Sequence, residues 1–320
     1  MKKFNLIVTV GPAILHKDKM KKIDAYGNCI YRINGAHVNP DKVSIIVEKL
    51  RSMLPQARIM LDLPGNKIRT VGLSEPIRLK KGEDFALYEH QINYPKFFSH
   101  LKKGDIILAN DSMSTFEVAK TCKTSINLLS HSDGLLHSNK GLHVKGIHKN
   151  IPYLFEKDRI LIEAAFSAGV DYLSLSFVRT ADDIRAVKEI LKNRNMHIVA
   201  KVETIAAVNH LSDIFQEVQS IVIDRGDLST ETGMINLLAI QDRIVESAKR
   251  EKIDVYLATQ FLKNMEENPV PLIAEVTDLC RTIQSGVSGI QLSEETAVGK
   301  YPISCVKLVF DILKNSSNSL

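Results

Sequence analysis

The sequence predicts an α/β protein, a (β/α)8 TIM barrel with a small β-rich insertion after its third strand. Short apolar runs of strand length alternate with amphipathic stretches of helix length, which is the pattern of parallel strands joined by crossover helices. Eight strand segments can be counted, and eight is the number that closes such a barrel. An open doubly wound sheet is the alternative that the same alternation permits.

Each expected strand is a short run rich in branched aliphatic and aromatic side chains. In chain order the runs are NLIVTV from Asn5, CIYRIN from Cys29, RIMLDL from Arg58, YLSLSF from Tyr172, HIVAKV from His197, SIVIDR from Ser220, DVYLAT from Asp254 and GIQLSEE from Gly289. Amphipathic stretches of ordinary helix length lie between them, at residues 40–54, 181–194, 237–252 and 273–284.

The alternation breaks once, between about residues 71 and 150. This stretch contains turn signals such as Ser132-Asp133-Gly134 and short alternating runs, so it predicts a small β-rich unit. Because barrel active sites lie at the C-terminal ends of the strands, an insertion after strand three is placed to close over the site. The expected division is a catalytic barrel domain of residues 1–70 and 149–320 and a lid domain of residues 71–148.

The composition indicates a soluble cytoplasmic protein that binds small anions. No apolar run reaches the roughly 18 residues of a membrane-spanning helix, and the N-terminus enters a strand directly, without a targeting leader. The net charge of +5 is spread along the chain, which argues against nucleic acid and suits phosphates and carboxylates. The cysteines have neither disulfide-framework nor zinc-site spacing: Cys29, Cys122, Cys280 and Cys305. The oligomeric state stays open, a homo-oligomer included.

Charged residues interrupt the buried-looking run HIVAKVET. Lys201 and Glu203 lie two residues apart, so they point to the same face of a strand. The next run ends IVIDRGD and brings Asp227 to a comparable height. Two carboxylates with room for substrate oxygens are what a substrate-bridging Mg²⁺ or Mn²⁺ ion requires. An internal salt-bridge layer of the barrel has about equal weight when this strand is taken alone, because structural ion pairs also occupy strand ends.

Polar residues also end the neighbouring runs. Thr259 ends DVYLAT, and a short helix is expected to begin at Leu228, just after Asp227. The free amides of that helix, with those of Gly226 and Asp227, would bind a carboxylate.

The second and third runs add a guanidinium and further polar groups. Arg32 and Asn34 lie two residues apart, while Asp62 and Arg69 lie at and just beyond the end of the third run. Arginine suits a transferring phosphoryl group, because its fork matches phosphate oxygens and stays charged. A three-carbon phospho-acid carries the complementary phosphate and carboxylate groups.

These residues belong to segments that resemble the pyruvate kinase family, in order, over nearly the whole chain. The segments are TVGPA (9–13), YRINGAH (31–37), LDLPGNKIRT (61–70), EKD (156–158), LSFVR (175–179), AKVET (200–204), IDRGDL (223–228), ATQFL (258–262) and LSEETAVGKYP (292–302). So many matches in one order are improbable by chance.

The resemblance implies roles around phosphoenolpyruvate. Lys201 would stabilise the enolate and the phosphoryl group, and Arg32 would grip the phosphate. Glu203 and Asp227 would hold Mg²⁺ or Mn²⁺. The remaining substrate-binding residues implied by the resemblance are Gly226, Asp227, Thr259, Ser293 and Glu295. Of these, Thr259 would also help to place the proton donor.

The resemblance also implies a nucleotide side. The residues that match positions near ADP or ATP, or that close over its phosphates from the lid, are Asn34, His37, Arg69, Asp111 and Lys140. The two lid matches, in NDS and NKG, only approximate the family pattern.

The family's monovalent-cation site is degenerate in this sequence. Asn34 and Asp62 remain, whereas Ala36 and Leu63 replace hydroxyl residues. Lys67 stands where potassium-dependent members carry Glu and potassium-independent members carry Lys. A fixed ammonium near the phosphates can replace a bound cation, so the sequence predicts independence of potassium.

Other departures bear on the acceptor. Pro64 replaces a family Lys, Gly35 a Phe and Glu294 a Gly, and the lid is shorter than a full one. The sequence ends after the last expected barrel helix, so the family's C-terminal domain, with its effector site, is not expected in it.

Three functions are therefore weighed. The first is the glycolytic transfer of the phosphoryl group of phosphoenolpyruvate to ADP, giving pyruvate and ATP. The second is a Mg²⁺-dependent enzyme acting on phosphoenolpyruvate or a 2-oxo acid with another acceptor, in a specialised biosynthetic route. The third is a catalytically silent regulatory homologue. The intact set of Lys201, Glu203, Asp227, Arg32 and Thr259 argues against the third.

Overall fold

The computed structural model describes residues 4–109, 113–192 and 194–318. Eight parallel strands close into a barrel in the order β1-β15-β14-β13-β12-β11-β3-β2. Their bounds are β1 Asn5–Thr9, β2 Cys29–Asn34, β3 Arg58–Asp62, β11 Tyr172–Leu175, β12 His197–Val202, β13 Ser220–Asp224, β14 Asp254–Ala258 and β15 Gly289–Leu292. The predicted (β/α)8 barrel is confirmed, and all eight expected strands begin at the expected residue.

Alternate side chains along each strand point into the barrel and fill its interior. In β1, Leu6 and Val8 pack outward against the helices, whereas Ile7 points into the barrel. The interior apolar layer is formed by Ile7, Ile30, Met60, Val199, Val222, Tyr256 and Ala258. Successive inward positions lie two residues apart, so the next inward side chains toward the C-terminal mouth belong to Arg32, Asp62, Lys201 and Asp224.

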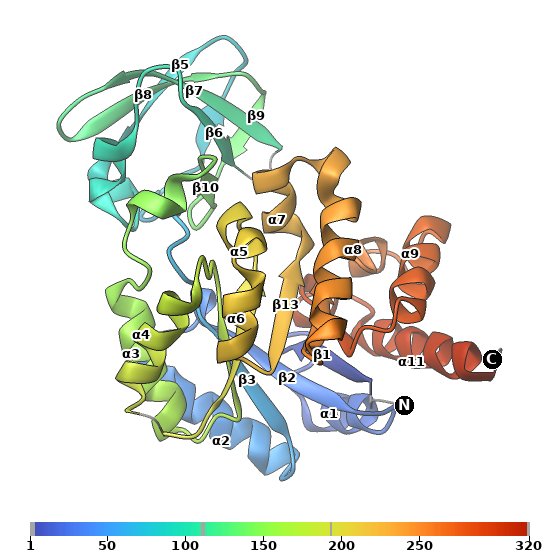
Figure 1. Ribbon diagram of the computed structural model, residues 1–320. Coiled ribbons are helices and arrows are strands. Elements are labelled where there is room, and N and C mark those ends of the chain that lie inside the picture. The colour runs from blue at the N-terminus through green and yellow to red at the C-terminus, as the bar shows by residue number, and fades with distance from the viewer. Residues whose placement is uncertain (1–3, 110–112, 193, 319–320) are drawn as a thin grey trace.

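Helices surround the barrel (Figure 1). They are α1 Lys17–Asp24, α2 Val43–Met53, α3 Glu156–Ser167, α4 Ala181–Ile190, α5 Ile205–Asn209, α6 Leu211–Glu217, α7 Arg225–Thr232, α8 Met234–Arg250, α9 Ile273–Gln284, α10 Glu294–Ala297 and α11 Pro302–Asn318. The four helices expected from amphipathic stretches correspond to α2, α4, α8 and α9. Of these, α9 has the expected bounds, and α4 ends four residues early.

Seven strands between β3 and α3 form the insertion, here called the lid. Their bounds are β4 Ile77–Leu79, β5 Asp84–Tyr88, β6 Ile106–Ala109, β7 Ser114–Thr121, β8 Ser125–Ser130, β9 Gly134–Leu136 and β10 Leu142–His143. They make a five-stranded sheet of order β10-β6-β7-β8-β5 and a β4-β9 pair. The lid has its own apolar core, which includes Phe97, Phe116 and Leu128.

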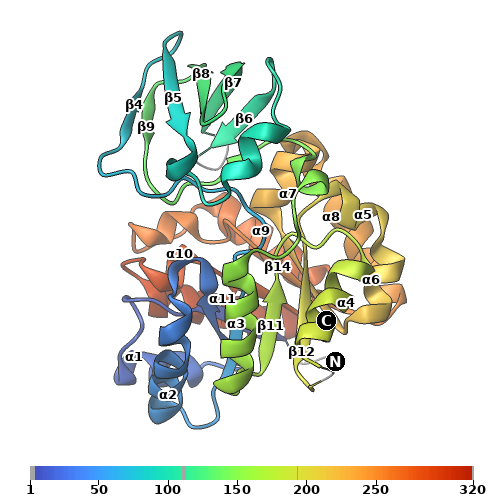
Figure 2. The same cartoon turned by 90° about the vertical axis from the view of Figure 1, so that its left-hand side faces the viewer.

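The lid lies over the end of the barrel toward which the strand arrows point (Figures 1 and 2). The chain enters and leaves it side by side, because Thr70 and Asn139–Lys140 exchange backbone hydrogen bonds of 2.7 and 2.9 Å. Over the described ranges, none of the helices combines the length and apolarity required to cross a bilayer.

Candidate active site

Charged side chains gather at the C-terminal mouth of the barrel, beneath the lid. Lys201 of β12 is buried, and its Nζ lies 2.5 Å from Glu203 Oε1, 3.2 Å from Asp224 Oδ2 and 3.7 Å from Asp62 Oδ2. Lys201 and Glu203 continue the inward face that Val199 begins lower in the barrel. The two side chains therefore point to the same inner face of the barrel, as the sequence predicts.

The charge on Lys201 is set by its neighbours. Burial opposes the ammonium form, but the carboxylates of Asp62, Glu203 and Asp224 outweigh burial and hold the pKa of Lys201 well above its usual value. The site thus contains a permanently positive group in a low-dielectric environment.

Three carboxylates face one another beside that ammonium. Glu203, Asp224 and Asp227 each offer an oxygen, and the three oxygens lie within 4.8 Å of one another. Glu203 Oε2 accepts a 2.6 Å hydrogen bond from the Phe177 amide, while Oε1 is paired with the Lys201 ammonium at 2.5 Å. Three carboxylate oxygens this close together form an oxygen-only cluster that fits a hard divalent cation such as Mg²⁺ or Mn²⁺.

Without a cation the acids repel one another. Burial raises the pKa of Glu203, Lys201 opposes that rise, and the negative charges of Asp224 and Asp227 add to it. A bound divalent cation would reverse this shift by favouring the carboxylate form. The cluster therefore has the electrostatics of a cation site.

Asp224 was not among the residues singled out in the sequence. Its Oδ1 accepts a 2.6 Å hydrogen bond from Thr259 Oγ1, so it links the cation cluster to β14. The signal that would have found it is the inward alternation of β13, in which Val222 precedes it by two residues.

The helix after β13 begins earlier than expected. α7 starts at Arg225 with Asp224 as its extended N-cap residue, not at Leu228, because the strand passes into the helix without a loop. The amides of Gly226 and Asp227 therefore lie in the first turn, where backbone N–H groups have no helical acceptor. This geometry supports the expected carboxylate-binding role of both residues.

Thr259 is held in an unusual conformation at the end of β14. Its φ is +83° and that of Gln260 is +58°, in the left-handed region that is costly for residues other than glycine. The Thr259 carbonyl accepts hydrogen bonds of 3.1 and 2.6 Å from the Arg225 guanidinium. These bonds fix the turn and aim the Thr259 hydroxyl at Asp224.

Arg32 is buried against Asp62. Nε and Nη2 donate to Asp62 Oδ2 at 2.9 and 2.5 Å, and Nη1 donates to Thr9 Oγ1 at 2.9 Å. Burial alone would raise the pKa of Asp62, but Lys201 and Arg32 hold it below its ordinary value. These bonds use three of the five guanidinium hydrogens, so two remain for a phosphate.

The three residues of the expected degenerate monovalent-cation site have separate partners. Lys67 Nζ lies 2.5 Å from Asp227 Oδ1, Asn34 Oδ1 accepts from the Ala36 amide, and Asp62 pairs with Arg32. Lys67 thus reaches the divalent-cation cluster instead of a separate pocket. Its ammonium is half of an ion pair with one of the expected metal ligands.

Glu295 stabilises the loops at Ser293 and Leu262, and neither Ser293 nor Glu295 contacts the Lys201 ammonium. Glu295 is buried, and its carboxylate accepts from the amides of Ser293 (2.6 Å) and Leu262 (3.3 Å). Burial raises the pKa of Glu295. No contact among the described residues joins either side chain to Lys201.

Residues expected near the nucleotide contact the leaving segment of the lid from the barrel. His37 Nδ1 lies 3.2 Å from Asn139 Nδ2, and Arg69 Nη1 donates to the Asn139 carbonyl at 3.4 Å. Burial and the charge of Arg69 lower the pKa of His37. Lys140 follows in the chain with an exposed side chain, and Asp111 lies outside the described residues.

The fold and the site together define a class: a (β/α)8 barrel protein with a buried lysine and a carboxylate cluster at its C-terminal mouth. Comparison with known proteins agrees with that class. The family model "Pyruvate kinase, barrel domain" matches residues 1–306. The chain belongs to the pyruvate kinase family.

Named relatives extend the similarity over the whole chain. The pyruvate kinase of Thermotoga maritima is 30% identical over 100% of this chain and 72% of its own length. That of Thermococcus litoralis is 31% identical over 98% of this chain and 70% of its own. That of Thermoplasma acidophilum is 28% identical over 97% of this chain, which spans 57% of that relative.

Proposed function

We propose that the protein transfers the phosphoryl group of phosphoenolpyruvate to ADP, giving pyruvate and ATP. The observation that carries the proposal is the position of Lys201, a buried ammonium within 2.5–3.7 Å of three carboxylates at the barrel mouth. Family membership supports an enzyme of this kind.

Different groups of the chain would hold the divalent cation and the substrate carboxylate. Glu203, Asp224 and Asp227 would hold a divalent cation, which supplies charge neutralisation to substrate oxygens. The free amides of Gly226 and Asp227 would bind the substrate carboxylate at the start of α7.

Two cations face the developing negative charge. The Lys201 ammonium would stabilise the enolate oxygen, and the two uncommitted N–H groups of Arg32 would hold the phosphoryl oxygens. Because both groups are fixed by buried partners, little reorganisation is needed when charge develops. The Thr259 hydroxyl, aimed at Asp224, would help to place the proton that converts enolate to pyruvate.

We propose further that the reaction is independent of potassium. Lys67 places a fixed ammonium 2.5 Å from Asp227, inside the region where substrate phosphates and cation would meet. A permanent positive charge there replaces the field of a monovalent ion.

A second acceptor is the alternative, supported by the nucleotide side. Pro64 offers no charge to an acceptor, and Glu294 adds an acid whose charge acts on His37. These features leave the phosphoenolpyruvate half intact and make the ADP half less cationic.

The test is to incubate the protein with phosphoenolpyruvate, Mg²⁺ and each nucleoside diphosphate, with and without potassium, and to follow phosphorus species by NMR. We expect ATP and pyruvate to appear together, at a rate unchanged by potassium. Consumption of phosphoenolpyruvate without nucleotide phosphorylation would show that the acceptor is a molecule other than a nucleoside diphosphate. Ligand binding without turnover would favour the silent homologue, and strong potassium activation would refute the role of Lys67.

A further inference from the structure

A second cluster of potential metal ligands lies between the lid and the barrel. His143 ends β10, His148 lies in the 3-10 helix η5 (Ile147–Asn150), and Glu231 lies near the end of α7. One ligand atom from each lies within 4.8 Å of the others, and the three residues are only 9%, 4% and 3% exposed. Glu231 is one helical turn beyond Asp227, so this cluster adjoins the proposed active site without sharing a ligand with it.

His148 has the hydrogen-bonding arrangement of a metal-binding histidine. Its Nδ1 lies 3.0 Å from Asn66 Oδ1, and Asn66 Nδ2 donates to the Pro152 carbonyl, which fixes the orientation of the amide. Because an amide oxygen only accepts, His148 Nδ1 carries the proton and Nε2 presents a lone pair. That Nε2 is buried without a hydrogen-bond partner among the described residues. An outer hydrogen bond that fixes the tautomer is characteristic of metal-ligating imidazoles.

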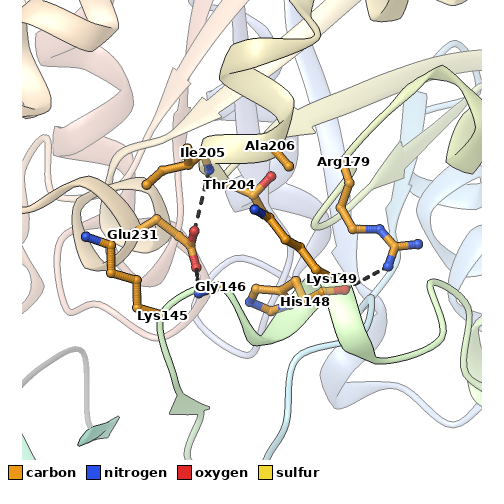
Figure 3. Close-up of a pocket in the computed structure, with 9 residues that line it drawn as sticks. All are labelled: Lys145, Gly146, His148, Lys149, Arg179, Thr204, Ile205, Ala206 and Glu231. Carbon is orange, nitrogen blue, oxygen red and sulfur yellow. Dashed lines mark hydrogen bonds between the residues drawn. The ribbon is translucent and has the colours of Figure 1, made fainter. Parts of the chain in front are cut away.

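His143 and Glu231 complete the donor set. His143 Nε2 lies 3.2 Å from Glu231 Oε1, yet it too is buried without a hydrogen bond. The centroids of the two imidazole rings are 5.7 Å apart. Glu231 is oriented by long amide contacts from Gly146 (3.3 Å) and Ile205 (3.5 Å), which leave lone pairs on both oxygens (Figure 3).

An internal hydrogen-bonded cluster does not account for these atoms. Both rings are buried, and neither Nε2 atom has a hydrogen-bond partner among the described residues. A buried polar atom without a hydrogen bond destabilises the folded protein, and two ring nitrogens share that condition here. A cation bound between them would satisfy both.

The surroundings leave room for such an ion. His148 and Glu231 line a cavity of about 140 Å³, and Figure 3 draws both among the side chains that surround it. The nearby guanidinium of Arg179 is neutralised by Asp183 at 2.6 Å. Lys145 and Lys149 also line the cavity, but both are exposed, so their charges are screened by solvent.

We propose that His143, His148 and Glu231 bind a Zn²⁺-type transition-metal ion, with its fourth position open to the cavity. Two imidazole nitrogens and one carboxylate are a donor set that Zn²⁺ accepts in tetrahedral sites and that Mg²⁺, which prefers oxygen, does not. The cysteine spacing considered in the sequence could not reveal this site, because it uses no thiol.

The site would join two parts of the molecule. Two ligands come from the lid and its exit segment, and the third comes from the helix that carries Asp227. Metal binding would therefore fix the lid relative to α7.

The probe is Co²⁺ added to chelator-treated protein in excess Mg²⁺, so that the oxygen-only cluster is occupied. We expect the visible absorption of tetrahedral cobalt with nitrogen ligands, at one ion per chain and displaced by Zn²⁺. His143→Gln and His148→Gln should abolish the band, whereas His137→Gln, an exposed lid histidine, should keep it. Glu203→Gln should also keep it, which separates this site from the proposed active site.

Two further measurements keep the proposal testable if a ligand variant does not fold. Asn66→Ala, which removes only the partner of His148 Nδ1, should weaken Co²⁺ binding by roughly 10–100-fold. Zn²⁺ should raise the Tm of the unmutated protein more than that of Asn66→Ala at equal concentration. No cobalt band in the unmutated protein, a band unchanged in both His variants, or equal Tm shifts would each overturn the proposal.

Discussion

The charge on Lys201 depends on its neighbours more than on its own chemistry. A lone buried ammonium tends to lose its proton, but three surrounding carboxylates reverse that tendency. The same carboxylates are too many for one lysine, so the cluster needs Arg32, and in our proposal a divalent cation, to balance it. The protonation state of each charged residue at this mouth therefore depends on the charges of the others.

Lys201→Met should remove the ammonium while keeping most of the side-chain volume. We expect turnover of phosphoenolpyruvate to fall by at least about 10²-fold, because a fixed charge facing the enolate is lost. The matched control is Lys300→Met, an exposed lysine paired with Glu267 on the surface. Steady-state rates on the true substrate check this, and near-normal turnover in Lys201→Met would contradict the site.

Asp62→Asn should expose how much the buried pair with Arg32 contributes to stability. Removing one partner leaves a buried guanidinium uncompensated, so we expect a loss of about 3–5 kcal/mol in the free energy of unfolding at pH 7. The pKa of Asp62 is lower in the folded protein than its ordinary value of 3.8. The stabilisation that its charge provides is therefore complete well above pH 3.8 and is lost as the pH falls.

The difference between the unmutated protein and Asp62→Asn should therefore narrow as the pH falls from about 5 toward and below 3.8. Urea unfolding at a series of pH values measures it. A difference that stays constant over that range would mean that Asp62 does not act through its charge.

At the scale of elements, strands were easier to predict than the ends of the segments between them. Short apolar runs between amphipathic stretches placed all eight strands, because a barrel strand is buried on both of its faces. The start of α7 was misplaced, since no loop or capping hydrogen bond separates it from β13. Contacts such as Lys67 with Asp227 join residues 160 positions apart, and no local pattern encodes them.

The first turn of α7 carries a prediction of its own. A Cβ at Gly226 would lie 3.0 Å from Thr259 Cγ2, closer than side chains normally pack. Gly226→Ala should therefore displace Thr259 and crowd the proposed carboxylate site. Alanine also favours a helix over glycine by about 1 kcal/mol, so stability should hold or rise slightly.

We expect Gly226→Ala to raise KM for phosphoenolpyruvate by about tenfold, the equivalent of 1.4 kcal/mol of lost binding, with little change in Tm. Ser229→Ala, in the next turn of the same helix, is the control. Equal KM values in the two variants would mean that the start of α7 does not bind the substrate.

At the scale of the whole molecule, the lid is tied to the barrel at few points. The entering and leaving segments pair at Thr70 and Asn139–Lys140, and the lid holds a core separate from that of the barrel. The carboxylates and Lys201 belong entirely to the barrel. In the proposed reaction, the barrel would therefore supply the groups that hold the cation and phosphoenolpyruvate, and the lid would approach them together with Arg69 and His37.

Replacing residues 72–137 by a short Gly-Asn turn should preserve the barrel, because the flanking backbones already lie side by side. Ile68 and Leu142 would lose lid contacts, so we expect a lower Tm but a cooperative transition. The shortened protein should bind Mn²⁺ with the affinity of the full chain, measured by electron paramagnetic resonance, since Glu203, Asp224 and Asp227 all remain. Turnover should be lost, because nothing closes the mouth against water. Loss of Mn²⁺ binding in a cooperatively folded variant would show instead that the lid contributes to the cation site.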